Sequence, residues 1–152
     1  MPKIDIDAMD EVNRSGYPDP FNALVSGRFR KRLGDAGGLT QFGVNLTRLA
    51  PGSASAQRHW HHKEDEFVFI LSGEAVLIDD AGEHPMGPGD AAAFKASDPN
   101  GHHIVNRSNA DVMLLEIGSR MPGEAADYPD IDLKAVPEDG KLVFRHKDGS
   151  AY

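Results

Sequence analysis

Short runs of alternating apolar and polar residues fill the middle of the chain. Between Gln41 and Gly118 these runs are separated by clusters of Gly, Pro, Asn and Asp. Alternation with a period of two predicts strands that bury one face, and many short strands joined by turns are typical of an all-β barrel or sandwich. We expect strands over residues 41–49, 58–61, 66–71, 75–78, 83–86, 91–94, 102–106 and 112–117.

Two local predictions follow from this pattern. In the first strand Phe42, Val44 and Leu46 alternate with small or polar residues, and we expect these three side chains to face inward. The turn residues around Gly73 predict a tight hairpin between the strands at 66–71 and 75–78.

The two flanks lack this alternation and also lack the apolar period of a helix. We therefore expect residues 1–40 and 119–152 to form N-terminal and C-terminal arms wrapped on a barrel at 41–118, all within one domain. The basic run Arg28–Arg32 is expected to be a solvated edge of a strand or arm.

Composition narrows the classes of function. The 152 residues carry a net charge of −8, which disfavours nucleic acid and anionic lipid as partners. Because cysteine is absent, any metal must be held by histidines and carboxylates. The first residues lack the apolar core of a signal peptide, and no apolar run approaches the roughly 18 residues of a membrane span. We expect a cytoplasmic protein without a membrane segment.

Five of the seven histidines fall in two short windows, at 59–62 and 102–103. His59 and His61 share one face of an extended segment, and Glu66 opens the next expected strand, so two imidazoles and a carboxylate can converge. Nitrogen and oxygen ligands of this kind suit Fe, Mn, Ni, Co or Zn. His62 and His103 are each one residue out of phase with these positions, and we expect His102 rather than His103 to face the same side as Asn106.

The spacing of these residues resembles the cupin superfamily. Its first motif is matched by Gly52, His59-Trp60-His61, Glu66 and, after six intervening residues, Gly73. The second is matched by His102 and Asn106, although the Pro99-Asn100-Gly101 turn abuts His102 directly where the family pattern leaves two residues between. The resemblance covers residues 41–118 and is closest to small, single-domain bacterial cupins of the conserved-barrel type.

This resemblance implies a jelly-roll-like double-stranded β-helix with one divalent metal ion per chain, and a homodimer. The implied ligands are His59, His61, Glu66 and His102. Cupins include dioxygenases, decarboxylases, isomerases, lyases and sugar-binding sensors, so the fold leaves the reaction open.

Three functions remain as hypotheses, each with a small organic molecule as substrate or ligand. The first is an iron-dependent dioxygenase. The second is a non-redox isomerase or lyase acting on a sugar or hydroxy acid, and the third is a sensor without turnover. We expect apolar walls beside the metal, built from Val68, Ile70 and Ile104, which favour a partly apolar ligand over a free sugar. Glu64 lies either in a solvated turn or at the rim of the site as an acid or base.

Overall fold

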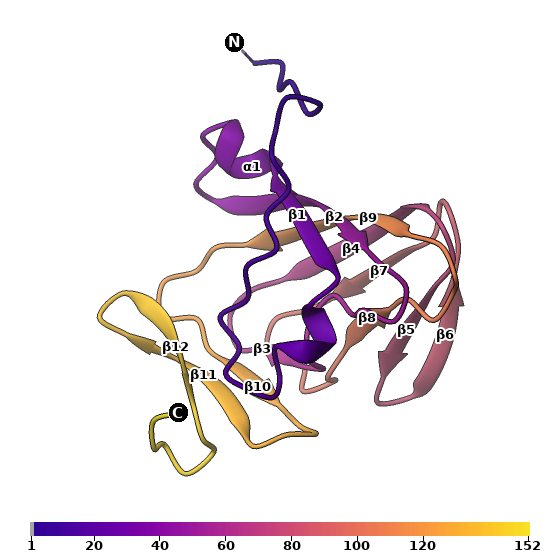
Figure 1. Ribbon diagram of the computed structural model, residues 1–152. Coiled ribbons are helices and arrows are strands. Elements are labelled where there is room, and N and C mark those ends of the chain that lie inside the picture. Colours follow the sequence, from indigo (N-terminus) through magenta and orange to yellow (C-terminus); the bar gives the residue numbers. More distant parts are fainter. Residues whose placement is uncertain (1) are drawn as a thin grey trace.

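The computed structural model describes residues 2–152, which form β-strands joined mainly by turns (Figure 1). A short helix, α1 (Leu33–Ala36), and a 3-10 turn (Ala23–Val25) lie in the N-terminal part. The strands are β1 (Arg28–Arg32), β2 (Phe42–Leu49), β3 (Trp60–His61), β4 (Glu66–Ser72), β5 (Ala75–Asp79), β6 (Gly82–Met86), β7 (Ala91–Phe94), β8 (His103–Val105), β9 (Val112–Ser119), β10 (Ala126–Tyr128), β11 (Leu133–Glu138) and β12 (Lys141–Arg145).

These strands form three antiparallel sheets. The five-stranded sheet has the order β1-β2-β9-β4-β7, the three-stranded sheet β6-β5-β8, and the four-stranded sheet β12-β11-β10-β3. In Figure 1 the three-stranded sheet lies at the right and the four-stranded sheet at the lower left, with the five-stranded sheet across the upper part. Every strand expected from the sequence is present within two residues of its expected bounds, and the all-β fold class is confirmed.

The main hydrophobic core lies between the five-stranded and three-stranded sheets. Ile70 of β4 and Leu114 of β9 are fully buried and belong to one cluster with Leu77 of β5 and Ile104 of β8. Burying this apolar surface is the largest favourable contribution to folding. The core therefore joins the two sheets into the barrel.

A second, smaller core joins the C-terminal strands to the N-terminal segment. Tyr128 of β10 and Leu133 of β11 are buried and pack against Tyr17 and Phe144. The ring of Tyr17 meets that of Tyr128 edge to face, with 5.8 Å between centroids. Chain segments far apart in sequence thus cover the open end of the barrel together.

Strands from both flanks extend the barrel. β1 pairs with β2 along its whole length, from Arg28 opposite Leu49 to Arg32 opposite Asn45. At the other end β10 pairs with β3, where Ala126 lies opposite His61. The division into a barrel at 41–118 and two arms stays a prediction, and both arms contribute strands to sheets that include residues of 41–118.

The predicted inward face of β2 is wrong. Thr47 and Leu49 are fully buried, whereas Phe42 is 42% exposed, so the odd-numbered positions face the interior. The reason is that the interior beside the first half of β2 is polar, so that the polar residues turn inward and the apolar ones lie on the outer surface.

The homodimer implied by the family resemblance stays a prediction.

The predicted hairpin at Gly73 is also wrong. β4 pairs with β7 and β9, whereas β5 pairs with β6 and β8, so the chain crosses from one sheet to another at this turn. The turn residues mark the reversal correctly, but they carry no information about which strands become hydrogen-bonded neighbours.

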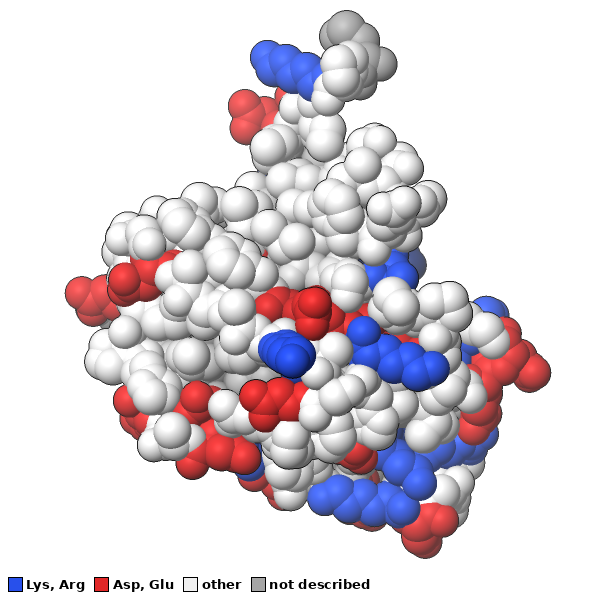
Figure 2. All heavy atoms as spheres, turned by 180° about the vertical axis from the view of Figure 1, so that it is seen from behind, with Lys and Arg blue, Asp and Glu red and all other residues white. Residues whose placement is uncertain are grey.

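Figure 2 shows charged side chains of both signs interspersed over the lower part of the face seen from behind, with a largely uncharged area above them. Basic and acidic groups on this face therefore lie close enough to offset one another. In residues 2–152, every helix is too short or too polar to cross a bilayer.

Gly73 provides a test of how the crossing between sheets is built. Its φ is +86°, and an added Cβ would lie 2.5 Å from the Asp111 carbonyl oxygen and 2.9 Å from the Val112 Cα. Gly52 has a similar φ of +82° but open space around it. We expect Gly52→Ala to cost about 1–2 kcal/mol of unfolding free energy through backbone strain. Gly73→Ala should cost about 1–3 kcal/mol more, because backbone atoms must move.

Urea unfolding of both variants checks this expectation. Equal losses in the two variants would contradict the tight packing of Gly73 against the segment that opens β9.

Candidate metal centre

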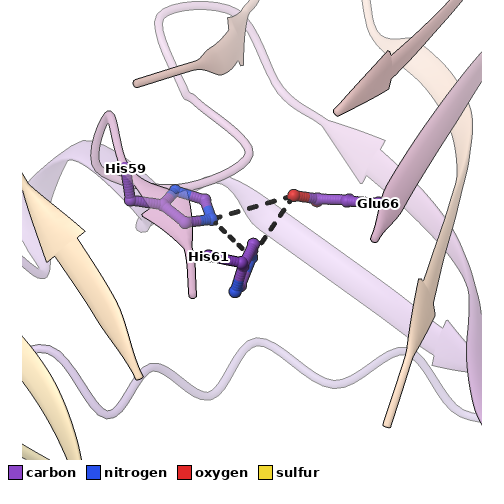
Figure 3. Close-up of side chains that lie close together, drawn as sticks. All are labelled: His59, His61 and Glu66. Atoms are coloured by element: carbon purple, nitrogen blue, oxygen red, sulfur yellow. Dashed lines mark hydrogen bonds and ion pairs between the residues drawn. The ribbon is translucent and has the colours of Figure 1, made fainter. Parts of the chain in front are cut away.

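Two short segments bring three of the predicted ligands together. His59 lies just before β3, His61 is within it, and Glu66 begins β4. Figure 3 shows the three side chains pointing toward one another. The Nε2 atoms of His59 and His61 are 3.0 Å apart, and the Glu66 Oε2 lies 3.8 Å and 3.4 Å from them. One ligand atom from each residue lies within 4.8 Å of the other two, as a shared metal requires.

The fourth predicted ligand adjoins this group. A β-bridge pairs His102 with His59 across the barrel. The Nε2 of His102 lies 2.8 Å from the Glu66 Oε2, and its ring stacks on Phe94 with 3.5 Å between centroids. His103 points elsewhere, because its Nδ1 donates to the Ala56 carbonyl at 2.9 Å. The structure therefore places His102, and not His103, beside the other three.

Hydrogen bonds on the outer side of each ring fix how the imidazoles are aimed. The Nδ1 of His59 donates to the Gln57 carbonyl at 2.8 Å, and the Nδ1 of His61 lies 3.3 Å from the Glu124 carboxylate. With the proton on Nδ1, each Nε2 presents a lone pair inward. This is the arrangement of second partners that metal-binding histidines have in proteins.

Glu124 contacts the predicted site, and the sequence did not reveal it. Besides His61 it accepts hydrogen bonds from the backbone N–H groups of His62 and Lys63, at 3.0 Å and 2.9 Å. It lies in the C-terminal flank, 63 residues from His61, and only the pairing of β10 with β3 brings the two together. No local spacing signals such a contact.

The chemistry of the donor set fits a divalent cation. Two imidazole lone pairs and a carboxylate oxygen face one another within 4 Å. Three acceptors at this separation repel unless a proton or a cation lies between them. Oxygen and nitrogen donors without sulfur suit the borderline and hard ions named above.

Burial and charge set the protonation of these groups in opposite directions. Burial lowers the pKa of His59 to about 4, against the pull of Glu66. Burial opposes ionisation of Glu66, but the neighbouring imidazoles of His102 and His61 outweigh it and hold the pKa of Glu66 well below its usual value. For His61 burial is likewise outweighed by Glu66, and the pKa rises. His59 is therefore neutral and Glu66 ionised at neutral pH.

The group opens into a cavity of about 350 Å³, and most of the residues that line it have polar side chains. The expected apolar walls are wrong, because Val68, Ile70 and Ile104 lie in the main core instead. Val68 and Ile70 lie on the same face of β4 as Glu66, but at these two positions that face packs into the main core. Among the residues that line the cavity are Tyr17, Arg28, Arg30, Asn45, Glu116 and Tyr128.

The basic run Arg28–Arg32 was expected to be a solvated edge, and this expectation is wrong for Arg28 and Arg30. Arg28 is 7% exposed and Arg30 is half-buried, and both side chains line the cavity. Alternate residues of β1 face inward, so that Arg28 and Arg30 share a face while Arg32 remains exposed. The period of two in Arg-Phe-Arg was the available signal, but it gives no indication of which face is buried.

Glu64 lies at the cavity, which favours the rim position over a fully solvated turn. The side chain is half-buried, and its Oε1 accepts a hydrogen bond from the backbone N–H of Met121 at 2.8 Å. Burial raises its pKa above the usual value. Its role as an acid or base stays a hypothesis.

Metal loading tests the predicted ligands. We expect about one divalent ion per wild-type chain after reconstitution and dialysis, measured by elemental analysis. His61→Ala and Glu66→Ala should lose the metal, with affinity falling by more than the roughly 10–100-fold typical of outer-shell changes. His84→Ala is the matched control, because His84 is exposed on β6. Affinity should fall as the pH drops, and the fall should begin above about 6.5, because His61 has a raised pKa and protonated imidazole cannot bind metal.

Comparison of His102→Ala with His103→Ala tests the fourth ligand. His102 contacts Glu66, so its loss should weaken metal binding at least about tenfold. His103 contacts a backbone carbonyl, so its loss should leave metal binding unchanged. The opposite result in a competition titration with a chelator would show that His103 provides the ligand.

Known proteins share both the motif and the fold. Residues 45–118 match the Cupin domain family. No curated protein sequence matches the chain. A crystal structure of a sugar phosphate isomerase from a cupin superfamily, from Silicibacter pomeroyi, is 51% identical, with a TM-score of 0.95 over 99% of this chain and 96% of that chain.

Two further solved structures are more distant. A protein from Acidithiobacillus ferrooxidans, provisionally named a sugar phosphate isomerase, is 31% identical, with a TM-score of 0.75 over 84% of this chain and 82% of its own. A Cupin 2 conserved barrel domain protein from Salinispora arenicola is 20% identical over 79% of this chain and 87% of its own, with a TM-score of 0.56, and shares the fold. The predicted cupin fold is thus confirmed. With half of its residues identical to a cupin over nearly the full length of both chains, this chain belongs to the cupin superfamily.

Proposed function

We propose that the protein is a metal-dependent isomerase acting on a small phosphorylated sugar. The observation that carries this proposal is a histidine and carboxylate cluster that opens into a cavity with three arginines in its wall, Arg28, Arg30 and Arg120. The 51% identity to the Silicibacter pomeroyi protein supports the same class of substrate. A cavity of about 350 Å³ is within the roughly 300–1,000 Å³ typical of small-molecule sites.

The metal and the chain have separate tasks in this proposal. His59, His61, Glu66 and His102 would hold a divalent ion, which supplies the polarisation of a substrate carbonyl or hydroxyl oxygen. Glu124 and the Gln57 carbonyl hold the imidazoles in the orientation that keeps Nε2 available. The polar wall can bind the hydroxyl and phosphate groups of a sugar, which an apolar wall would leave unpaired.

Interconversion of an aldose and a ketose moves a proton between neighbouring carbon atoms, which requires a base within reach. Glu64 is a carboxylate at the cavity, within 4.8 Å of His61 and Glu124. Tyr128 stacks on His59, and burial holds the pKa of its hydroxyl well above the usual value, so that it remains a proton donor. We assign Glu64 the base and Tyr128 a hydrogen bond to the substrate.

The dioxygenase hypothesis loses its support in the polar cavity. It rested on apolar walls beside the metal, and those side chains pack in the core. The isomerase, which the sequence left as the second hypothesis, needs polar contacts to a sugar and a base, and the cavity offers both.

Proton NMR with aldose and ketose phosphates tests the proposal. We expect the protein loaded with Mn, Zn, Co or Fe to interconvert a matched pair, and to do so with far lower kcat/KM for the sugars without phosphate. Glu64→Gln should lower kcat by about 10²–10⁴. Glu74→Gln, which changes an exposed carboxylate in the turn between β4 and β5, should leave kcat unchanged.

An outcome without isomerisation for any metal form and any sugar phosphate would contradict the proposal. Oxygen consumption by the Fe(II) form with a phenolic or keto-acid substrate would favour the dioxygenase hypothesis over the isomerase.

A further inference from the structure

Three arginines line the cavity, and they differ in what balances their charge. Arg120 is paired with Asp35. Arg30 is paired with Glu116 through two contacts, Nε to Oε2 at 2.9 Å and Nη2 to Oε1 at 3.2 Å. Thr47 donates a third hydrogen bond to the same carboxylate at 2.8 Å. Arg30 and Glu116 therefore form a closed, mutually neutralised pair in the wall.

Arg28 has no such partner. Its Nη1 donates to the Ser55 carbonyl at 2.7 Å and its Nη2 to the Arg14 carbonyl at 3.4 Å. Within residues 2–152, no carboxylate lies within 4.0 Å of its guanidinium, although only 7% of the residue is exposed. The Ser55 carbonyl also accepts from Arg30 at 3.2 Å, so two cations share one carbonyl and one carboxylate serves only one of them.

A buried cation without a counter-charge is unfavourable unless something else supplies the charge. Burial and the neighbouring Arg30 lower the pKa of Arg28 to about 10, so that the group remains charged at neutral pH. Two of its five N–H donors are used by backbone carbonyls, which leaves further donors for a ligand. The planar arrangement of these donors matches the oxygens of a phosphate group.

We propose that Arg28 is the residue that binds the anionic group of the substrate, and that this group is a phosphate monoester. The inference rests on the proposed function for the phosphorylated sugar, but it concerns the binding of the anion and not the reaction. Arg30 has a positioning role, because its charge is already matched by Glu116. A substrate bound in this way would extend across the cavity, with its phosphate at Arg28 and its reacting end at the histidine cluster.

Inorganic phosphate is the probe that tests the binding of the anion separately from turnover. Calorimetric titration of the wild-type chain with EDTA present, which prevents phosphate from binding to a metal, should show one saturable site per chain. Arg28→Met should weaken phosphate binding at least tenfold, and Arg28→Lys, which retains the charge without the planar donors, should recover part of it. Arg107→Met is the matched control, because Arg107 pairs with Glu83 on the surface outside this cavity. It should bind phosphate as the wild type does.

Circular dichroism and urea unfolding establish that each variant is folded, and Arg28→Lys carries the test if Arg28→Met is not. Phosphate binding that is absent in the wild type, or unchanged in both Arg28 variants, overturns the proposal. Binding of acetate or succinate that depends on Arg28, without binding of phosphate, overturns the assignment to phosphate.

Kinetics distinguish this inference from the proposed function. If isomerisation is found, Arg28→Met should raise KM for the sugar phosphate about 10–100-fold, and Arg107→Met should leave KM unchanged. Phosphate binding that depends on Arg28, in a protein without isomerase activity, would support the inference and contradict the proposed function. Isomerisation with the same KM in Arg28→Met and Arg107→Met would support the proposed function and contradict the inference.

Discussion

The contact of one carboxylate with three imidazoles is the interaction on which the rest of the structure depends. The Glu66 oxygen lies between 2.8 Å and 3.8 Å from the Nε2 atoms of His59, His61 and His102. Polar groups brought this close inside a barrel need fixed positions and matched charge. The bridge between His59 and His102 and the pairing of β3 with β10 supply the positions. The other polar residues of the interior, such as Arg30 and Glu116, balance charge beside this cluster.

Because the buried charges must be matched, the interior of the barrel has an apolar end and a polar end. Below the cluster, alternate residues of β4 and β9 are apolar and fully buried, and they form the main core. Beside the cluster, the inward residues of β2 and β9 are polar, with Thr47 donating to Glu116 and Glu116 paired to Arg30. One strand can serve both ends, as β2 does when its inward face changes from Asn45 and Thr47 to Leu49.

Local pattern was sufficient to predict the strands and the convergence of His59, His61 and Glu66, because both depend on spacing within short segments. The position of His102 beside them was an implication of the cupin resemblance. His59, His61 and Glu66 fall within a segment of eight residues, and alternation alone places the two imidazoles on one face. Strand partners could not be predicted in this way, which is why the turn at Gly73 was taken as a hairpin. The inward face of β2 was also missed, since the rule that apolar residues face inward fails where the interior holds a charged site.

The flanks, which the sequence left almost without function, supply most of what distinguishes the cavity. Tyr17, Arg28 and Arg30 come from the segment before residue 41, and Glu124 and Tyr128 from the segment after 118. The matched cupin region at 45–118 holds all four predicted metal ligands. A division of this kind lets one barrel keep its metal chemistry while the flanking strands change the ligand it accepts. The side chains that β1 and β10 add to the cavity therefore lie outside the matched cupin region and can change without altering the four predicted ligands.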